Sequence, residues 1–307
     1  MTQTDHKTIQ TEVLRSDSLL LLAAFFWGTT FVAQRIAMDH MGPMTYNALR
    51  FALGGITLLP IIIRSRLRRT KAPSKPWPLP LKLGCVLAGT VLFAAASFQQ
   101  AGLVHTTAGK AGFITCLYVV IVPVIGIFLG HRCGLPVWIG AVLSVLGLYL
   151  LSITDSLTIS RGDLLVLISA FFWAIHVLLI GHLATRANPI SIACIQFFAC
   201  SALSLLAALL FERITLSSIV ASTIPILYSG IFSAGVAFTL QVVCQQTCPP
   251  AHAAVIMSME TVFAALAGWL ILSEILTFRQ LTGCAFMLAG FLAVQLTPKP
   301  PAHTIAP

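Results

Sequence analysis

The stretch LLLLAAFFWGTTF at residues 19–31 returns in altered form as LLVLISAFFWAIH at residues 164–176. The tetrapeptide Ala-Phe-Phe-Trp stands at residues 24–27 and again at residues 170–173, 146 positions further on. Its neighbours keep the same offset, because Pro43 aligns with Pro189 and Phe51 aligns with Phe197. A duplication carries its surroundings along whereas a chance match does not, so the pattern predicts an internal repeat.

The composition is that of a membrane protein. Of the 307 residues, 58% are hydrophobic and only 9% are charged, whereas a soluble domain carries about 25% charged residues. Apolar runs of about 18 to 22 residues recur, and helices of that length cross a hydrocarbon core of about 30 Å. Ten spans are expected, at residues 18–37, 44–63, 80–101, 108–129, 136–153, 164–183, 190–210, 224–244, 252–272 and 279–296.

The later parts of the two halves also align, at a slightly smaller offset. FQQAGLVHTTAGKAGFI at residues 98–114 lies over LQVVCQQTCPPAHAAVI at 240–256, and Gly140 and Gly147 align with Gly283 and Gly290. The repeated unit therefore contains five spans. Because five is odd, the second unit enters the membrane from the opposite face. The sequence predicts an all-α integral membrane protein of ten transmembrane helices, arranged as two inverted five-helix repeats.

The basic residues predict the orientation. If the N-terminus is cytoplasmic, 12 of the 18 Lys and Arg residues fall on the inner side, six of them in the segment 64–75. This excess has the sign of the positive-inside rule, so both termini are expected to be cytoplasmic. The net charge of +9 is therefore ascribed to contact with the lipid bilayer. Nucleic acid is not an expected partner, because no binding motif or aromatic platform accompanies the basic residues.

The expected organisation follows from the repeat and the polar ends of the chain. A cytoplasmic tail is predicted at 1–17, the first repeat at 18–153, the second repeat at 164–296 and a cytoplasmic tail at 297–307. The first apolar run lacks a convincing cleavage site and is read as a retained span rather than a signal peptide. Five of the eight cysteines lie inside apolar spans and show no CxxC spacing among them, namely Cys85, Cys116, Cys194, Cys200 and Cys284. They are expected to be small buried hydrophobic residues, and neither a metal site nor a cofactor is expected.

Three apolar motifs carry a family resemblance. AFFWG in the first span, ALRF in the second and SMETVFAALAGWLILSE in the ninth, together with the duplicated five-span unit, resemble the EamA branch of the drug/metabolite transporter superfamily. The resemblance covers about residues 18–296. It implies a proton-coupled or gradient-driven carrier in a bacterial inner membrane, often an exporter of amino acids or other small metabolites.

Two positions depart from that family pattern. Relatives commonly carry Glu-Pro in the ninth span, where this chain has Glu260 followed by Thr261. Without the proline, a helix bend at this point is in doubt. The glutamate that often follows the fourth span is His131 in the first repeat and Glu274 in the second.

Polar groups inside the spans are the candidate functional residues, because a polar or charged group is costly within the bilayer. Glu260 is the one carboxylate well inside a predicted span. It is expected to couple transport to protons or to bind an amino group of the substrate. The predicted substrate-binding residues are Trp27, Thr30, Gln34, Gln99, Trp173, His176 and Gln241.

Structural roles compete with these functional ones. Trp27, Thr30 and Gln34 lie at helical spacing on one face, and the sixth span repeats that face in part. Such residues also serve in packing, in lipid contact or in hydrogen bonds between helices. Arg50 and Lys110 lie toward the outer ends of their spans. Each is either an anchoring charge that snorkels to the membrane surface or a contact for an acidic substrate group.

The expected function is that of a carrier rather than an enzyme. Its expected partners are a small-molecule substrate, the lipid bilayer and the proton as a coupling ion, and both a monomer and a homodimer remain open. An intramembrane enzyme would need a nucleophile with its base or paired carboxylates, and a channel would need a polar lining. The spans offer one interior carboxylate and are otherwise apolar, and no phosphate-binding loop points to ATP.

Overall fold

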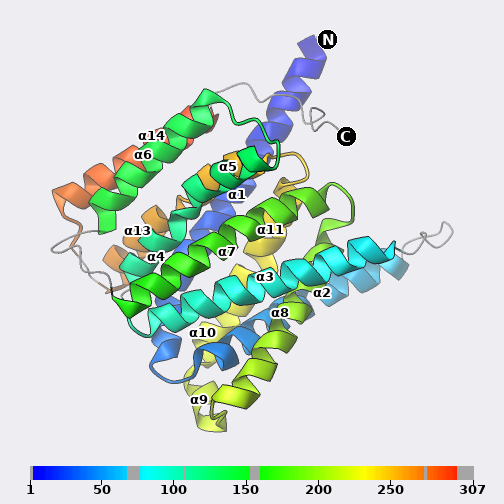
Figure 1. Cartoon of the computed structure of the whole chain (residues 1–307), viewed down its shortest axis with the longest axis vertical. Coiled ribbons are helices and arrows are strands. Elements are labelled where there is room, and N and C mark those ends of the chain that lie inside the picture. The colour runs from blue at the N-terminus through cyan, green and yellow to red at the C-terminus, as the bar shows by residue number, and fades with distance from the viewer. Residues whose placement is uncertain (1–2, 68–76, 107, 153–159, 273–274, 296–307) are drawn as a thin grey trace.

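The computed structural model describes residues 3–67, 77–106, 108–152, 160–272 and 275–295, and every regular element in these ranges is a helix. Figure 1 shows the helices packed side by side in one bundle. Seven spans are single helices: α1 (Gln3–Met38), α2 (Pro43–Leu67), α3 (Leu79–Leu103), α6 (Leu135–Ser152), α7 (Arg161–Ala184), α8 (Pro189–Phe211) and α14 (Phe278–Gln295).

Three further spans are assembled from consecutive shorter helices. The fourth consists of α4 (Ala108–Cys116) and α5 (Tyr118–Phe128), and the ninth of α12 (Pro250–Met257) and α13 (Glu260–Leu272). The eighth runs through α10 (Thr223–Tyr228), the π-helix η1 (Ser229–Phe238) and α11 (Thr239–Cys244). A short helix, α9 (Leu216–Ala221), precedes the eighth span and was not predicted from the sequence.

The helices confirm the predicted all-α membrane fold. Eight segments are long and apolar enough to cross a membrane by length and composition, and α6 and α14 bring the spans to ten. Their bounds agree with the sequence prediction to within a few residues, except that α1 already begins at Gln3, inside the expected polar tail. The predicted tail 297–307, Glu274 and most of the basic segment 64–75 lie outside the described residues.

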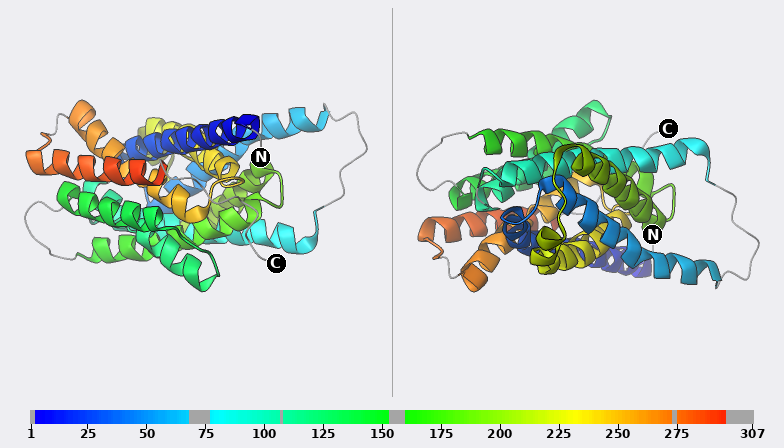
Figure 2. Two further views of the ribbon diagram at one scale, coloured as in Figure 1. Left: turned by 90° about the horizontal axis from the view of Figure 1, so that it is seen from above. Right: turned by 90° about the horizontal axis from the view of Figure 1, so that it is seen from below.

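The packing of α6 against α14 shows the two-fold relation between the repeats. These helices lie side by side at one edge of the bundle (Figures 1 and 2). A Cβ added to Gly147 would lie 2.5 Å from the carbonyl oxygen of Gly283, and one added to Gly290 would lie 2.8 Å from that of Gly140. Gly147 thus meets Gly283, and their repeat mates, Gly290 and Gly140, meet each other in the same way. A two-fold axis between the repeats requires this reciprocal contact.

The outer surface is apolar, as a bilayer requires. Large hydrophobic side chains stand outward on many helices, with Phe211 at the end of α8 81% exposed and Ile224 of α10 79% exposed. Inside, Phe51 and Phe197, which are repeat mates, are fully buried and lie with their ring centroids 6.1 Å apart. The interior thus retains the repeat that the sequence shows, while the surface is adapted to lipid.

A carboxylate at the end of α8 links the second repeat to the first. Glu212 accepts hydrogen bonds from the backbone N–H groups of Met44 and Thr45, both at 2.8 Å, and from the Thr45 hydroxyl at 2.6 Å. These N–H groups belong to the first turn of α2, which has no partners for them within the helix. A negative charge is also favourable at a helix N-terminus, so Glu212 fixes where α2 begins.

Candidate functional site

A cavity lies between the two repeats. Seven of its lining residues come from the first repeat and seven from the second. The first-repeat residues are Trp27, Phe31, Gln34, Arg50, Gln99, Thr115 and Tyr118, and the second-repeat residues are Trp173, Val177, Ser233, Phe238, Gln241, Met257 and Glu260. Ligand sites of secondary transporters form at such repeat interfaces.

Much of this lining consists of repeat mates. Trp27 and Trp173 are equivalent at the offset of 146, and Gln99 and Gln241 at the offset of 142. The second offset also makes Glu260 the mate of Tyr118. Because both members of each pair reach the same cavity, the cavity lies on the two-fold axis that relates the repeats.

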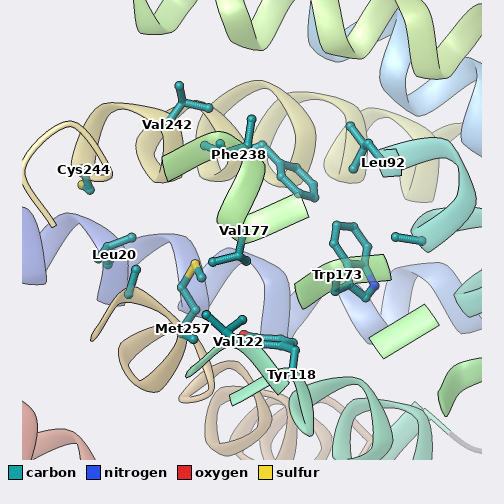
Figure 3. Packing of buried hydrophobic residues seen from close by; sticks show 14 of the residues in the cluster. Leu20, Leu92, Tyr118, Val122, Trp173, Val177, Phe238, Val242, Cys244 and Met257 are labelled. Carbon is teal, nitrogen blue, oxygen red and sulfur yellow. The ribbon is translucent and has the colours of Figure 1, made fainter. Parts of the chain in front are cut away.

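Aromatic rings form one wall of the cavity. The ring of Phe238, at the end of η1, lies 4.8 Å from that of Trp27 and 5.6 Å from that of Trp173 between centroids, and its stacking on Trp173 is nearly parallel. Figure 3 shows the rings of Phe238 and Trp173 pointing toward one another, with Met257 and Tyr118 reaching in from other helices. Such a wall suits the apolar or ring-bearing part of a solute.

Glu260 is the carboxylate of the cavity and is buried, with 5% of the residue exposed. The Cys116 thiol donates to its Oε1 at 3.2 Å, and the Tyr118 hydroxyl donates to the same oxygen at 3.4 Å. Among the described residues no cation forms an ion pair with it. Two neutral donors are weak compensation for a buried charge, so the site favours either a bound proton or a cationic partner from a ligand.

Arg50 is the cation of the cavity and is only 3% exposed. Its guanidinium lies over the rings of Tyr46 and Phe51, at 5.3 and 4.7 Å from their centroids, in the geometry of cation–π contacts. Within the part of the chain that the structure describes, no carboxylate pairs with it. The side chain therefore points into the protein and does not snorkel to the membrane surface, which leaves it available to an anionic group.

Several polar atoms of the lining have no hydrogen-bond partner among the described residues. They are Nε1 of Trp27 and of Trp173, Oε1 of Gln34 and of Gln241, and Nε of Arg50. Nearly all buried polar groups in proteins are paired with protein or with ordered water. Five such atoms belong to residues that line this one cavity, where a ligand or water molecules would supply their partners.

Helix breaks position these residues. α12 ends at Met257 and α13 begins at Glu260, and the Ser258 hydroxyl between them donates to the carbonyl of Val255 at 2.8 Å. Such a bond competes with the helical backbone ladder. The helix is thus interrupted at Glu260 although Thr261, and not a proline, follows it. The first repeat breaks at Leu117, which is the equivalent place at the offset of 142.

Three of the predicted site residues lie outside the cavity lining. Thr30 is buried, and its hydroxyl donates to the Phe26 carbonyl at 2.5 Å within α1. His176 is buried behind the aromatic wall, edge-on to Trp173, with Nε2 2.8 Å from Oε1 of Gln196. Lys110 forms an ion pair with Asp163 at 2.6 Å. The other predicted residues, Trp27, Gln34, Gln99, Trp173, Gln241, Glu260 and Arg50, all line the cavity.

Sequence reasoning missed other members of the site. Tyr118, Phe238 and Ser233 line the cavity, and Cys116 lies behind it against Glu260. The alignment of the repeats contained one usable signal, since Tyr118 is the mate of Glu260. No such signal marks Phe238, whose mate is Ala96 at the same offset. Its role arises because η1 brings this ring onto the axis.

Comparisons with known proteins agree with this architecture. The sequence model of the EamA-like transporter family matches residues 14–153 and again residues 160–296. An uncharacterized transporter of Archaeoglobus fulgidus is 33% identical over 290 residues, covering 92% of this chain and 86% of that protein. The uncharacterized transporter YwfM of Bacillus subtilis is 28% identical, covering 91% of this chain and 93% of that protein.

Two further matches bear on the membrane and the fold. The uncharacterized inner membrane transporter YedA of Escherichia coli is 23% identical, with 79% of this chain and 78% of that protein covered. A solved crystal structure superposes with a TM-score of 0.76 at 20% identity, covering 92% of this chain and 98% of that one. At that identity the superposition establishes the fold.

Proposed function

Because the chain belongs to the EamA-like transporter family, we propose that it is a secondary active carrier that moves small amphipathic organic solutes, such as amino acids, by alternating access. The observation that carries this proposal is the cavity shared by the two repeats. It holds a buried cation and a buried carboxylate, neither of which forms an ion pair among the described residues.

The two charges favour a solute that carries a carboxylate, an amino group or both. Burying a charge without an opposite partner is costly, and a ligand that supplies the partner removes that cost. A carboxylate of the solute would pair with Arg50, and an ammonium group would pair with Glu260. The planar guanidinium binds a carboxylate through two parallel hydrogen bonds, which also orients the solute.

The rest of the cavity favours an apolar body on that solute. Trp27, Trp173 and Phe238 present their rings, and Phe31, Val177 and Met257 add aliphatic and aromatic surface. The unpaired indole N–H groups of Trp27 and Trp173 supply hydrogen-bond donors at the edge of the same wall.

Glu260 is the proposed coupling group. Its carboxylate either holds a proton or pairs with a cationic solute, and these two occupants exclude one another at one buried oxygen pair. Exchange between them would link movement of the solute to movement of a proton in the opposite direction. This scheme requires no nucleotide and no metal.

Direction and location complete the proposal. The carrier acts as an exporter in a bacterial inner membrane, with both termini cytoplasmic. The excess of Lys and Arg on one side of the ten-span topology supports this orientation. The carrier functions as a monomer or a homodimer, and the cavity is complete within one chain.

The test is a comparison of metabolite export. Cells that produce the protein are compared with cells that produce the Arg50→Gln variant at equal membrane abundance, and solutes in the medium are surveyed by mass spectrometry. We expect faster release of one or a few solutes bearing a carboxylate and an apolar body, and loss of that release in the variant. Identical profiles for both strains across zwitterionic and anionic solutes would contradict the proposal.

A further inference from the structure

A buried polar cluster joins the two repeats at one end of the bundle. Asp17 of α1 is fully buried, and His252 of α12 is 5% exposed. Their side chains meet, with Nε2 of His252 3.2 Å from Oδ1 of Asp17. The Sγ atom of Cys248 lies within 4.8 Å of both groups. We call Asp17, His252 and Cys248 the first cluster.

A second polar cluster joins the two repeats where α4 and α7 begin. Lys110 of α4 donates to Oδ2 of Asp163 at 2.6 Å, and the Thr106 hydroxyl donates to Oδ1 of the same carboxylate at 2.8 Å. Asp163 lies in the first turn of α7, where it also accepts from the backbone N–H of Ser160 at 2.8 Å. We call Asp163, Lys110 and Thr106 the second cluster.

The two clusters are repeat mates, residue for residue. At the offset of 146 that aligns the Ala-Phe-Phe-Trp segments, Asp17 falls on Asp163. At the offset of 142 that aligns the fourth spans, Lys110 falls on His252 and Thr106 falls on Cys248. Each cluster therefore joins the first helix of one repeat to the fourth helix of the other. In both clusters, the aspartate at one repeat position contacts the basic residue at a second repeat position, and the two residues come from different repeats.

The clusters lie at opposite faces of the membrane. Asp17 is near the start of the first span and His252 near the start of the ninth, and both of these spans begin at one face because they are odd-numbered. Lys110 and Asp163 are near the starts of the fourth and sixth spans, which begin at the other face. Figure 1 shows α1 running from the N-terminus toward the end of the bundle where α4 and α7 begin.

We propose that the two clusters are the gates of the carrier, one at each membrane face. This rests on the proposed function, since alternating access requires the two repeats to separate at one face while they stay joined at the other. Each gate is a polar contact across the interface that must open. Both contacts are formed in this structure, and they join α1 to α12 at one face and α4 to α7 at the other.

The repeat relation favours a gating contact over a metal site at the first cluster. Asp, His and Cys side chains are all metal ligands, and three of them within 4.8 Å fit that description. Their mates are Asp163, Lys110 and Thr106. A lysine ammonium in the place of the histidine forms an ion pair and binds no metal. The property that both clusters share is attraction across the interface.

The experiment compares matched variants of the full chain in lipid nanodiscs by hydrogen exchange and mass spectrometry. Lys110→Gln and His252→Gln remove the basic partner at equivalent positions and leave the helix cap at Asp163 in place. Arg35→Gln is the control, because Arg35 pairs with Asp39, directly after the end of α1, at an exposed site that joins no two helices. No substrate is needed, so a failed transport assay would not affect the result.

We expect reciprocal changes in exchange. Lys110→Gln should speed exchange at the starts of α4 and α7 by about tenfold, the change expected when a hydrogen bond between charged groups is lost. The same variant should slow exchange at the start of α12, because opening one face withdraws molecules from the state open at the other. His252→Gln should do the reverse, and Arg35→Gln should change neither end.

Two outcomes would overturn the proposal. Either faster exchange only near the substituted residue, with no protection at the far end, or faster exchange at both ends would identify the clusters as structural contacts. If His252→Gln does not fold, Asp17→Asn tests the same end, since it removes the charge from the other partner. If Asp17→Asn speeds exchange only near the substituted residue, the proposal is likewise overturned.

Discussion

At the scale of single residues, the two charged groups of the cavity have no oppositely charged partner among the described residues. Glu260 has a thiol and a phenol as donors, and Arg50 has aromatic faces. Neither arrangement compensates a full charge as an opposite charge would. A site built this way is stabilised when a ligand or a proton enters it, which is how a carrier can respond to its cargo.

Replacing the glutamate by its amide tests the coupling. Glu260→Gln keeps the shape of the side chain and an oxygen that accepts from Tyr118, but removes the charge and the exchangeable proton. In proteoliposomes with an imposed pH gradient, we expect solute movement to lose its dependence on the gradient while solute exchange persists. Transport by the variant with an unaltered response to pH would remove Glu260 from the coupling step.

Removing either indole tests the aromatic wall. Trp27→Ala and Trp173→Ala should each weaken solute binding by about tenfold, the equivalent of about 1.4 kcal/mol, because each deletes a ring and an unpaired N–H from the cavity. Phe286→Ala is the control, since Phe286 is 36% exposed on α14 and does not line the cavity. Binding is measured by titration of the purified protein. Equal small losses in all three variants would assign the Ala-Phe-Phe-Trp residues to packing.

At the scale of elements, close helix contacts and helix breaks organise the molecule. Glycines let α6 and α14 meet backbone to backbone, while interruptions at Leu117 and before Glu260 open the fourth helix of each repeat beside the cavity. Gly54 likewise brings α2 close to η1, where an added Cβ would lie 2.6 Å from that of Ala234. Rigid contacts at the edge and irregular backbone at the centre suit a molecule that rearranges around its cavity.

A methyl group at the α6–α14 contact should be costly. In Gly147→Ala the added Cβ would lie 2.5 Å from the Gly283 carbonyl oxygen, so the helices must move apart. We expect a loss of about 1–3 kcal/mol, as for overpacked cores. Gly109→Ala is the matched control, because no atom lies within 4 Å of a Cβ placed there. Thermal unfolding in detergent measures both, and equal midpoints would contradict the close contact.

At the scale of the whole molecule, the inverted repeat determines both the site and the gates. A single axis brings Trp27 to Trp173 and relates Asp17–His252 to Lys110–Asp163. Two nearly equivalent ends are what a carrier needs to open toward either face with similar energy. The basic residue is His252 at one end and Lys110 at the other, so the contact that must break differs in strength between the two faces.

The orientation is tested with reporter fusions. A reporter after Ser74, which lies outside the described residues, should be cytoplasmic, because six basic residues occur at 64–75. A reporter after Arg213, in the connection that follows the seventh span, should be external. An external reading at Ser74 would reject the orientation, and the same reading at Ser74 and Arg213 would reject the alternation of spans on which the inverted repeat depends.

The sequence determined the spans, the repeat and much of the site. Hydrophobic length identifies spanning helices without knowledge of their neighbours, and the odd number of spans in the repeat dictates its inversion. The cost of polar groups in lipid singled out Glu260, and equivalent placement singled out the two tryptophans. These inferences need only local composition and the register between the halves, and both are present in the chain itself.

Only the tertiary structure decided which side chains meet. It turned Arg50 inward, placed Phe238 on the axis and paired Asp17 with His252. The sequence left Arg50 open between a snorkelling charge and a substrate contact. Phe238, Asp17 and His252 stand at span ends or on apolar runs, where composition gives no reason to single them out. The physical reason is that contacts depend on helix rotation, crossing and breaks such as η1, which are set by packing among all the helices at once. A linear pattern specifies each helix, whereas the gates and the cavity exist only between helices.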